Sequence, residues 1–112
     1  MEIKATEQDG INVLALSGRM DATTTPDFES AARTLLGQGK NVVIIDMADL
    51  EYISSAGLRG ILGLVKSIKA ACGKLAFCSL QPMAAEVFRI SGFNAMLTVC
   101  DTREDALSAL RN

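Results

Sequence analysis

The sequence contains no histidine and no tryptophan among its 112 residues. The absence of histidine excludes Ser-His-Asp and Cys-His catalysis, and it removes the commonest metal ligand and the usual general base near neutral pH. No pair of carboxylates beyond Asp46 and Asp49 suggests an acid–base site, and these two are expected to flank a turn. We therefore expect a protein that is not an enzyme and that uses no metal or cofactor.

Aromatic and basic residues are also scarce. The chain has one tyrosine, four phenylalanines and a formal net charge of −2, and no run of lysine or arginine builds a basic stripe. Nucleic-acid binding draws most of its affinity from such a stripe, and single-strand binding also needs aromatic rings for stacking. We therefore expect no nucleic acid as a partner.

No apolar run approaches the roughly 18–20 residues that span a bilayer. The N-terminal segment MEIKATEQDG is polar and acidic, unlike a signal peptide or an anchor, so we expect a cytoplasmic protein without a membrane partner. Cys72, Cys78 and Cys100 are odd in number, lack a CxxC spacing and each stand beside apolar residues. They are predicted to be buried, reduced thiols, with redox sensing as the alternative.

The length favours a single domain over residues 1–112, which is enough to bury a real core. Residues 2–6 and 11–18 alternate between apolar and polar, and Asp9-Gly10 between them is typical of a hairpin turn. The sheet is therefore expected to begin with an antiparallel pair.

Beyond the hairpin, helical and strand patterns alternate. Residues 41–47 are apolar on both faces, which is typical of a central strand, with Asp46 at its exit. Before this strand we expect a helix with Thr25 as N-cap that stops at Gly37, and after it a helix from Ser55 to about Cys72 that stops at Gly73. A strand over 74–80 and a helix over 82–91, ended by Gly92, are expected to follow. The last expected elements are a strand over 96–100 and a helix over 101–111 with Asp101 as N-cap. The fold class is α/β, a mixed sheet with element order β-β-α-β-α-β-α-β-α.

The helix that begins at Ser55 has one apolar face and three regularly spaced glycines. The apolar face is expected to comprise Leu58, Ile61, Leu62, Val65 and Ile68. The cations Arg59, Lys66 and Lys69 fall on the other side. The glycines Gly57, Gly60 and Gly63 are predicted to allow close packing against a neighbouring element.

The segment YISSAGLRGIL at the start of this helix admits three interpretations. Ser54 is suited to be the N-cap, worth about 1 kcal/mol, although a cap explains neither the second serine nor the early glycine. A catalytic serine is not supported, because neither G-x-S-x-G nor an S-x-x-K spacing from Ser54 or Ser55 is present. The third is phosphorylation of a hydroxyl that points outward at the positive end of the helix, where Gly57 keeps the approach open to another protein.

Three segments, SGRMDATTTPDFE, NVVIIDMADLEYISSAGLRGIL and KLAFCSLQPMAAEVFRISGF, resemble the anti-sigma factor antagonists, which are single-domain proteins of the STAS type. The resemblance covers nearly the whole chain and is most specific in YISSAGLRGIL. It implies the STAS fold, a mixed sheet with helices packed mainly on one side. It also implies bacterial partner switching, in which the unphosphorylated protein binds an anti-sigma factor that is also a serine kinase. Phosphorylation releases that partner, and a serine phosphatase restores the first state.

The same resemblance implies roles for individual residues. Ser55 matches the serine that is phosphorylated, with Ser54 as the fallback acceptor, and Asp21 matches the aspartate of a G-x-x-D loop near that serine. The implied partner surface comprises Asp21, Thr23, Thr24, Ser54, Gly57, Leu58 and Arg59. The chain departs from many members in carrying Ser54 where they have aspartate, and Ala56 where a second serine is frequent, which bears on the specificity of the kinase.

Two alternatives stay open. Asp46 resembles the acceptor aspartate of a response-regulator receiver, although the acidic pair and the late lysine that receivers need are not in the expected places. The other alternative is a STAS binding module that is never phosphorylated, either a subunit of a transport system or a binder of lipid or nucleotide. No glycine-rich phosphate loop is visible in the sequence to support nucleotide binding.

Overall fold

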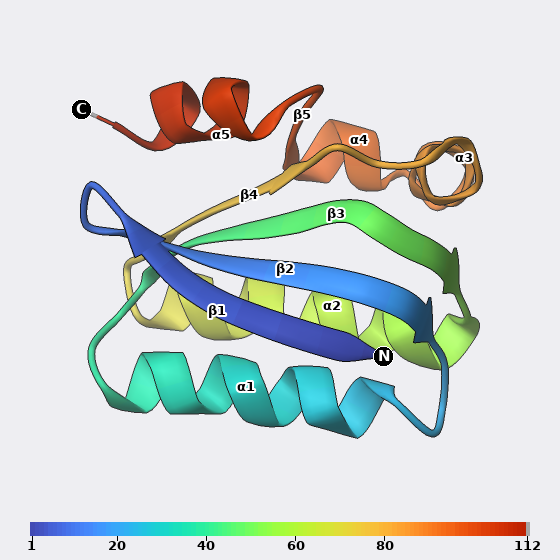
Figure 1. The fold of residues 1–112 in the computed structure, drawn as a ribbon, viewed down its shortest axis with the longest axis horizontal. Helices are drawn as coiled ribbons and strands as arrows, with labels where there is room; N and C mark the ends of the chain where they lie inside the picture. The colour runs from blue at the N-terminus through green and yellow to red at the C-terminus, as the bar shows by residue number, and fades with distance from the viewer. Residues whose placement is uncertain (112) are drawn as a thin grey trace.

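The protein folds around one five-stranded sheet (Figure 1). The computed structural model describes residues 1–111, and the strands lie in the spatial order β1-β2-β3-β4-β5. Their bounds are Glu2–Gln8 for β1, Ile11–Met20 for β2, Val42–Ile53 for β3, Lys74–Cys78 for β4 and Thr98–Cys100 for β5. β1 and β2 are antiparallel, and every later neighbouring pair is parallel. The predicted mixed sheet with an N-terminal hairpin is confirmed.

The hairpin turn has the backbone that its sequence predicts. Asp9 and Gly10 have φ angles of 54° and 78°, in the left-handed region that Asp tolerates and Gly adopts freely. The register pairs Gln8 with Ile11, which leaves these two residues as the whole turn. The Arg111 guanidinium lies 2.6 Å from the Asp9 carboxylate, so the end of the chain is joined to the hairpin.

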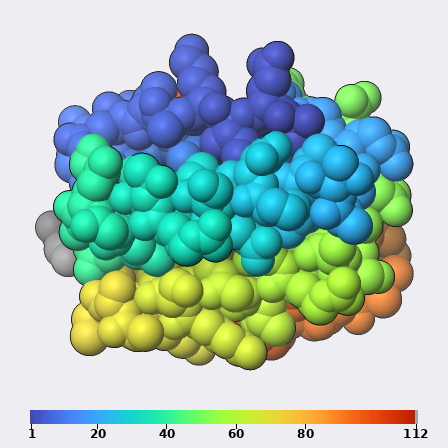
Figure 2. Space-filling model, turned by 90° about the horizontal axis from the view of Figure 1, so that it is seen from below, coloured from blue at the N-terminus to red at the C-terminus, as the bar shows by residue number. Residues whose placement is uncertain are grey.

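Five helices cover the two faces of the sheet unequally. Their bounds are Thr25–Gly37 for α1, Ser55–Ala70 for α2, Pro82–Ile90 for α3, Phe93–Met96 for α4 and Arg103–Leu110 for α5. Buried side chains of α1 to α4 share the larger hydrophobic core with one face of the sheet, whereas α5 forms a smaller core with the other. Figure 2 shows α1 and α2 side by side across the molecule. The prediction that helices pack mainly on one side is confirmed, while the single turn α4 was not predicted.

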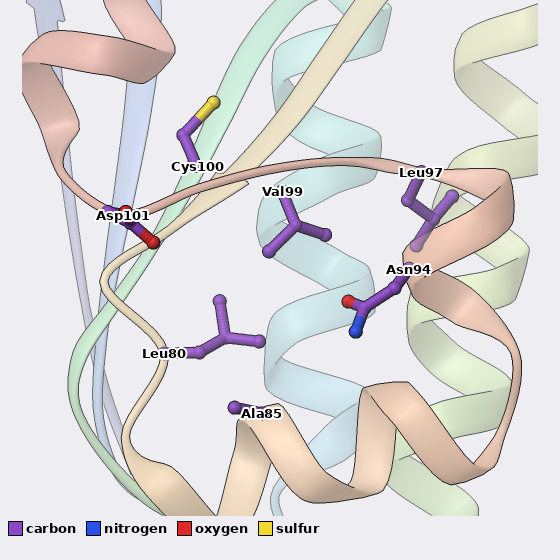
Figure 3. A pocket seen from close by; sticks show the side chains of 7 residues that line it. All are labelled: Leu80, Ala85, Asn94, Leu97, Val99, Cys100 and Asp101. Carbon is purple, nitrogen blue, oxygen red and sulfur yellow. The ribbon is translucent and has the colours of Figure 1, made fainter.

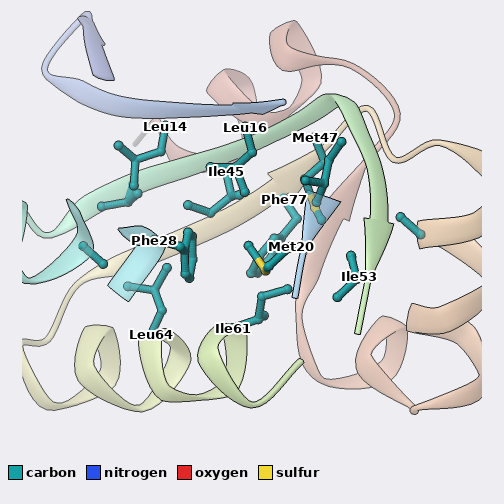
Figure 4. Packing of buried hydrophobic residues seen from close by; sticks show 14 of the residues in the cluster. Leu14, Leu16, Met20, Phe28, Ile45, Met47, Ile53, Ile61, Leu64 and Phe77 are labelled. Carbon is teal, nitrogen blue, oxygen red and sulfur yellow. The ribbon is translucent and has the colours of Figure 1, made fainter. Parts of the chain in front are cut away.

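The central strand β3 supplies both cores. Val43, Ile45 and Met47 are fully buried in the larger core, which Figure 4 shows between the sheet and the helices, and Ile44 is fully buried in the smaller one. Alternate side chains of a strand point to opposite faces, so a strand covered on both sides has a nearly continuous apolar run. The interpretation of residues 41–47 as a central strand is confirmed.

The strand β3 nevertheless continues to Ile53, well beyond the predicted end. The register between β2 and β3 shifts between Ala15 and Ser17, and at that irregularity the Ala48 amide donates to Asp46 Oδ1 at 3.0 Å. Such a bulge lets a strand bend and then resume pairing. The placement of Asp46 at the strand exit, and of Asp46 and Asp49 beside a turn, is therefore wrong.

Two of the predicted helix caps are also wrong by one residue. Thr24 precedes α1 as its N-cap and Thr25 is buried in the first turn. At α5 the cap is Thr102, whose hydroxyl accepts from the Asp105 amide at 3.1 Å, in place of Asp101. Adjacent threonine and aspartate side chains are both good caps, so the sequence alone does not select between them.

The core face of α2 differs from the prediction at one leucine and one glycine. Leu64 is buried whereas Leu62 is only half-buried. A Cβ added to Gly60 would lie 2.5 Å from Thr25 Cγ2, so this glycine lets α2 pack closely against α1, as predicted. Gly63 is exposed, and a Cβ added there would meet nothing within 4 Å, so a packing role for this residue is wrong.

The three cysteines are free, but only one of them is fully buried. Cys78 lies in the smaller core, where burial, reinforced by the nearby negative charge of Asp46, raises the pKa of its thiol to about 11. Cys100 is half-buried, and Cys72 is exposed in the turn after α2 with φ 54°. The prediction of a buried thiol is confirmed for Cys78 and wrong for Cys72.

Candidate functional site

The two serines before α2 have different environments. Ser54 is the N-cap, and its hydroxyl accepts a hydrogen bond from the Gly57 amide at 3.2 Å. Ser55 is the first residue of the helix and is exposed to solvent. The cap therefore uses the first hydroxyl and leaves the second at the surface, at the positive end of a helix.

Gly57 faces the interior of the protein. A Cβ at this position would lie 2.9 Å from Met20 Cγ, 3.0 Å from Ile53 Cγ2 and 3.0 Å from the Met20 carbonyl oxygen. The glycine is therefore required where the first turn of α2 packs against the end of β2. The expectation that Gly57 keeps the surface open to another protein is wrong, because the space that it leaves is inside the molecule.

The loop from β2 to α1 is organised by Asp21. The Thr23 and Thr24 amides donate to Asp21 Oδ1 at 3.0 and 3.1 Å, and the Asp21 amide donates to Thr24 Oγ1 at 2.9 Å. The Thr24 hydroxyl in turn donates to the Arg19 carbonyl oxygen at 2.7 Å. Donation from the Thr24 amide, with help from that of Thr23, lowers the pKa of the Asp21 carboxyl below its usual value. Asp21 therefore fixes the shape of this loop.

The Asp21 loop and the serine segment are joined through Met20. The Ser54 amide donates to the Met20 carbonyl oxygen at 2.9 Å, and the residue after Met20 is Asp21. Both loops emerge at the same edge of the parallel strands, at the right in Figure 1. The structure thus places the loop that contains Asp21, Thr23 and Thr24 beside the segment that contains Ser54 and Ser55.

The surface beside the serines is mixed in character. Leu58 is half-buried and Arg59 is exposed, one turn into α2. Across the sheet register, Arg19 of β2 pairs with Tyr52 of β3, and the guanidinium carbon lies 4.1 Å above the ring centroid. Sequence reasoning missed this pair, because two register shifts between the strands make the partner of Arg19 unpredictable from the pattern.

Asp46 belongs to a different part of the molecule. Its carboxylate accepts from Arg103 Nε at 2.8 Å and forms an ion pair with the same guanidinium, which joins α5 to the sheet. Among residues 1–111, no cluster of three or more His, Cys, Asp or Glu residues is arranged to hold a metal ion. This arrangement favours a structural role for Asp46 over the Mg²⁺-dependent phosphoryl acceptor of a receiver.

A hollow with a volume of about 370 Å³ lies among α3, α4 and β5 (Figure 3). Its lining comprises Leu80, Ala85, Asn94, Leu97, Val99, Cys100 and Asp101. None of these residues is among the predicted site residues, so the serine segment and the hollow are separate features.

No helix within residues 1–111 has both the length and the apolar character that a bilayer span requires.

Comparison with known proteins identifies the family. The family model of the STAS domain matches residues 2–106. BtrV of Bordetella bronchiseptica, an inferred anti-sigma factor antagonist, is 33% identical over 111 residues, which are 99% of this chain and 96% of BtrV.

The fold has close matches among solved structures. The crystal structure of an inferred anti-sigma factor antagonist from Thermotoga maritima superimposes with a TM-score of 0.93 at 21% identity, covering 98% of this chain and 95% of that one. The Bacillus cell fate determinant SpoIIAA in its phosphorylated form gives a TM-score of 0.76 at 21% identity, covering 98% and 100% of the two chains. The chain therefore belongs to the STAS domain family of anti-sigma factor antagonists.

Proposed function

We propose that this protein antagonises an anti-sigma factor by partner switching and that Ser55 is the switch. The unphosphorylated protein binds an anti-sigma factor that is also a serine kinase, in the cytoplasm of a bacterium. Phosphorylation of Ser55 by that kinase releases the complex, and a serine phosphatase restores the binding form. The protein acts by binding and not as an enzyme. The observation that carries the proposal is the exposed hydroxyl of Ser55 beside a capping Ser54.

The relatives support the proposal. BtrV and the Thermotoga protein are described as inferred anti-sigma factor antagonists. SpoIIAA, an anti-sigma factor antagonist, has been solved in both its unphosphorylated and its phosphorylated form. A phosphate on a STAS domain is therefore a property of a protein with the same fold as this chain.

A phosphate on Ser55 is compatible with the folded protein. It would add a charge of about −1.5 to −2 at the positive end of α2, where an anion stabilises a helix by about 0.3–1 kcal/mol. The first turn of α2 carries no acidic side chain that would repel it. The modification is therefore expected to change the surface without unfolding the domain.

The same charge would weaken a complex in which Ser55 is covered. Burying an uncompensated charge in an interface costs several kcal/mol, and each 1.4 kcal/mol is a factor of ten in affinity. We propose that the partner surface comprises Ser55 with Leu58 and Arg59 on α2, and Thr23 and Thr24 in the loop that Asp21 organises. Ser54 contributes by holding the helix start in place.

The test is phosphosite mapping by mass spectrometry on protein from its native cells, with and without phosphatase treatment. We expect one phosphate, on Ser55. Phosphate on Ser54 alone would reassign the switch to the fallback residue. No phosphate under any growth condition would overturn the switch and favour the constitutive binding module.

A matched set of variants tests the charge argument with the partner that co-purifies from the same cells. We expect Ser55→Ala to retain that partner permanently and Ser55→Asp to lose it. Ser108→Asp is the control, because Ser108 is an exposed serine on α5, on the opposite face of the sheet. Equal capture by Ser55→Ala and Ser55→Asp would contradict the electrostatic mechanism.

A further inference from the structure

Arg59 lies on the same face of α2 as Ser55. Both residues are exposed, and they stand four positions apart in one continuous helix. Residues at i and i+4 are neighbours on a helix surface, and a long helical side chain leans toward the N-terminus, over the preceding turn. Helix geometry therefore allows the guanidinium of Arg59 to reach over the turn that carries Ser55.

The charge of Arg59 is not used elsewhere in the described part of the chain. The ion pairs found among residues 1–111 join Arg89 to Glu86, Arg103 to Asp46 and Arg111 to Asp9. Glu29 of α1 lies near Gly60 of α2, since a Cβ added to Gly60 would lie 3.8 Å from Glu29 Cγ, and Glu29 forms no ion pair with Arg59. Asp21, in the neighbouring loop, has its Oδ1 occupied by two amides.

We propose that Arg59 is the intramolecular counter-ion of the phosphate on Ser55. This inference rests on the proposed function, because it concerns the phosphorylated form. An anion four residues N-terminal to a cation is the favourable orientation of a helical ion pair. Phosphorylation then changes the surface twice, since it adds an anion at Ser55 and withdraws the guanidinium of Arg59 from the partner.

The counter-ion is testable without the kinase. Phosphoserine is placed at position 55 by genetic code expansion, and the ³¹P resonance of the purified protein is titrated to obtain the second pKa of the phosphate. The variants are Arg59→Gln, which removes the cation, Arg59→Lys, which retains it, and Lys66→Gln as the control. Lys66 is an exposed cation on the same helix, roughly 16 Å further along the axis from Ser55.

We expect the second pKa of the phosphate to be higher in Arg59→Gln than in the wild type by about 0.2 to 0.4 pH units, the size of an i,i+4 ion pair. Arg59→Lys restores most of the shift, Lys66→Gln matches the wild type, and added salt reduces the difference. The helix terminus acts equally in all variants, so the comparison isolates the side chain. An identical pKa in the wild type and Arg59→Gln would overturn the counter-ion.

The outcome is independent of the phosphosite mapping. If native cells never phosphorylate Ser55, the proposed switch fails while this titration still reports whether Arg59 pairs with a phosphate placed there. If the mapping finds phosphate on Ser55 and the titration shows no effect of Arg59, the switch stands and only the counter-ion is rejected.

Discussion

Replacing Gly57 by alanine tests how tightly the serine segment is packed against the end of β2. The added Cβ would lie 2.9 Å from Met20 Cγ, 3.0 Å from Ile53 Cγ2 and 3.0 Å from the Met20 carbonyl oxygen. The Met20 side chain is fully buried in the core, and the Met20 carbonyl oxygen is backbone and accepts the Ser54 amide. The clash therefore acts on the hydrogen bond that joins the two loops of the candidate site.

The magnitude follows from two opposing terms. Alanine is favoured over glycine in a helix by at most about 1 kcal/mol, whereas inserting a methyl group into a packed site costs about 1–3 kcal/mol. Gly63→Ala is the matched control, because Gly63 lies in the same helix with nothing within 4 Å of an added Cβ. The helical gain is similar in both variants, so the difference between them reports the clash, about 1–3 kcal/mol in favour of Gly63→Ala.

Urea unfolding at neutral pH measures the free energy of unfolding of both variants. In thermal unfolding, each kcal/mol of difference corresponds to roughly 4 °C in Tm. We expect Gly63→Ala to be more stable than the wild type and Gly57→Ala to be less stable. Equal free energies of unfolding for the two variants would refute the close contact and contradict the placement of Gly57 against the interior of the protein.

Three further predictions concern other charged groups and thiols. Arg103→Gln leaves the nearly buried Asp46 carboxylate without its cation, so urea unfolding is expected to show a loss of about 1–3 kcal/mol; an unchanged stability would contradict a structural role for the pair. A thiol reagent at about pH 8 should label Cys72 rapidly and Cys78 only on unfolding, because Cys78 is buried with a pKa of about 11; since Cys100 is half-buried and also free, the decisive variant is Cys72→Ser with Cys100→Ser, and its rapid labelling would exclude this order. The pKa of Asp21 is lower in the folded state than its ordinary 3.8, so its stabilising effect is complete above that pH and is lost as the pH falls through the folded value. The stability difference between wild type and Asp21→Asn should accordingly be larger at neutral pH than at about pH 3, and a difference independent of pH would reject the role of its carboxylate.

Much of the fold follows from local sequence. The turn at Asp9-Gly10 requires left-handed backbone that these residues adopt readily, and residues 42–45 are apolar at successive positions because both faces of β3 are covered. Ser54 was predicted as a cap and is one, since capping depends on a few neighbouring residues. The family resemblance predicted that the Asp21 loop lies near the serine segment, which no local pattern indicates.

Tertiary structure decided the features that depend on residues distant in the chain. The sequence by itself determined that a glycine stands two positions after Ser55, but only the packing of α2 on β2 places its missing side chain against Met20. The bulge at Asp46 likewise arises from pairing with β2. After the bulge, β3 continues to Ile53, and Tyr52 pairs with Arg19. Hydrogen bonds between neighbouring residues can be predicted from a short segment. Contacts between elements depend on how the faces of different helices and strands pack together, and the pattern of one segment does not specify that packing.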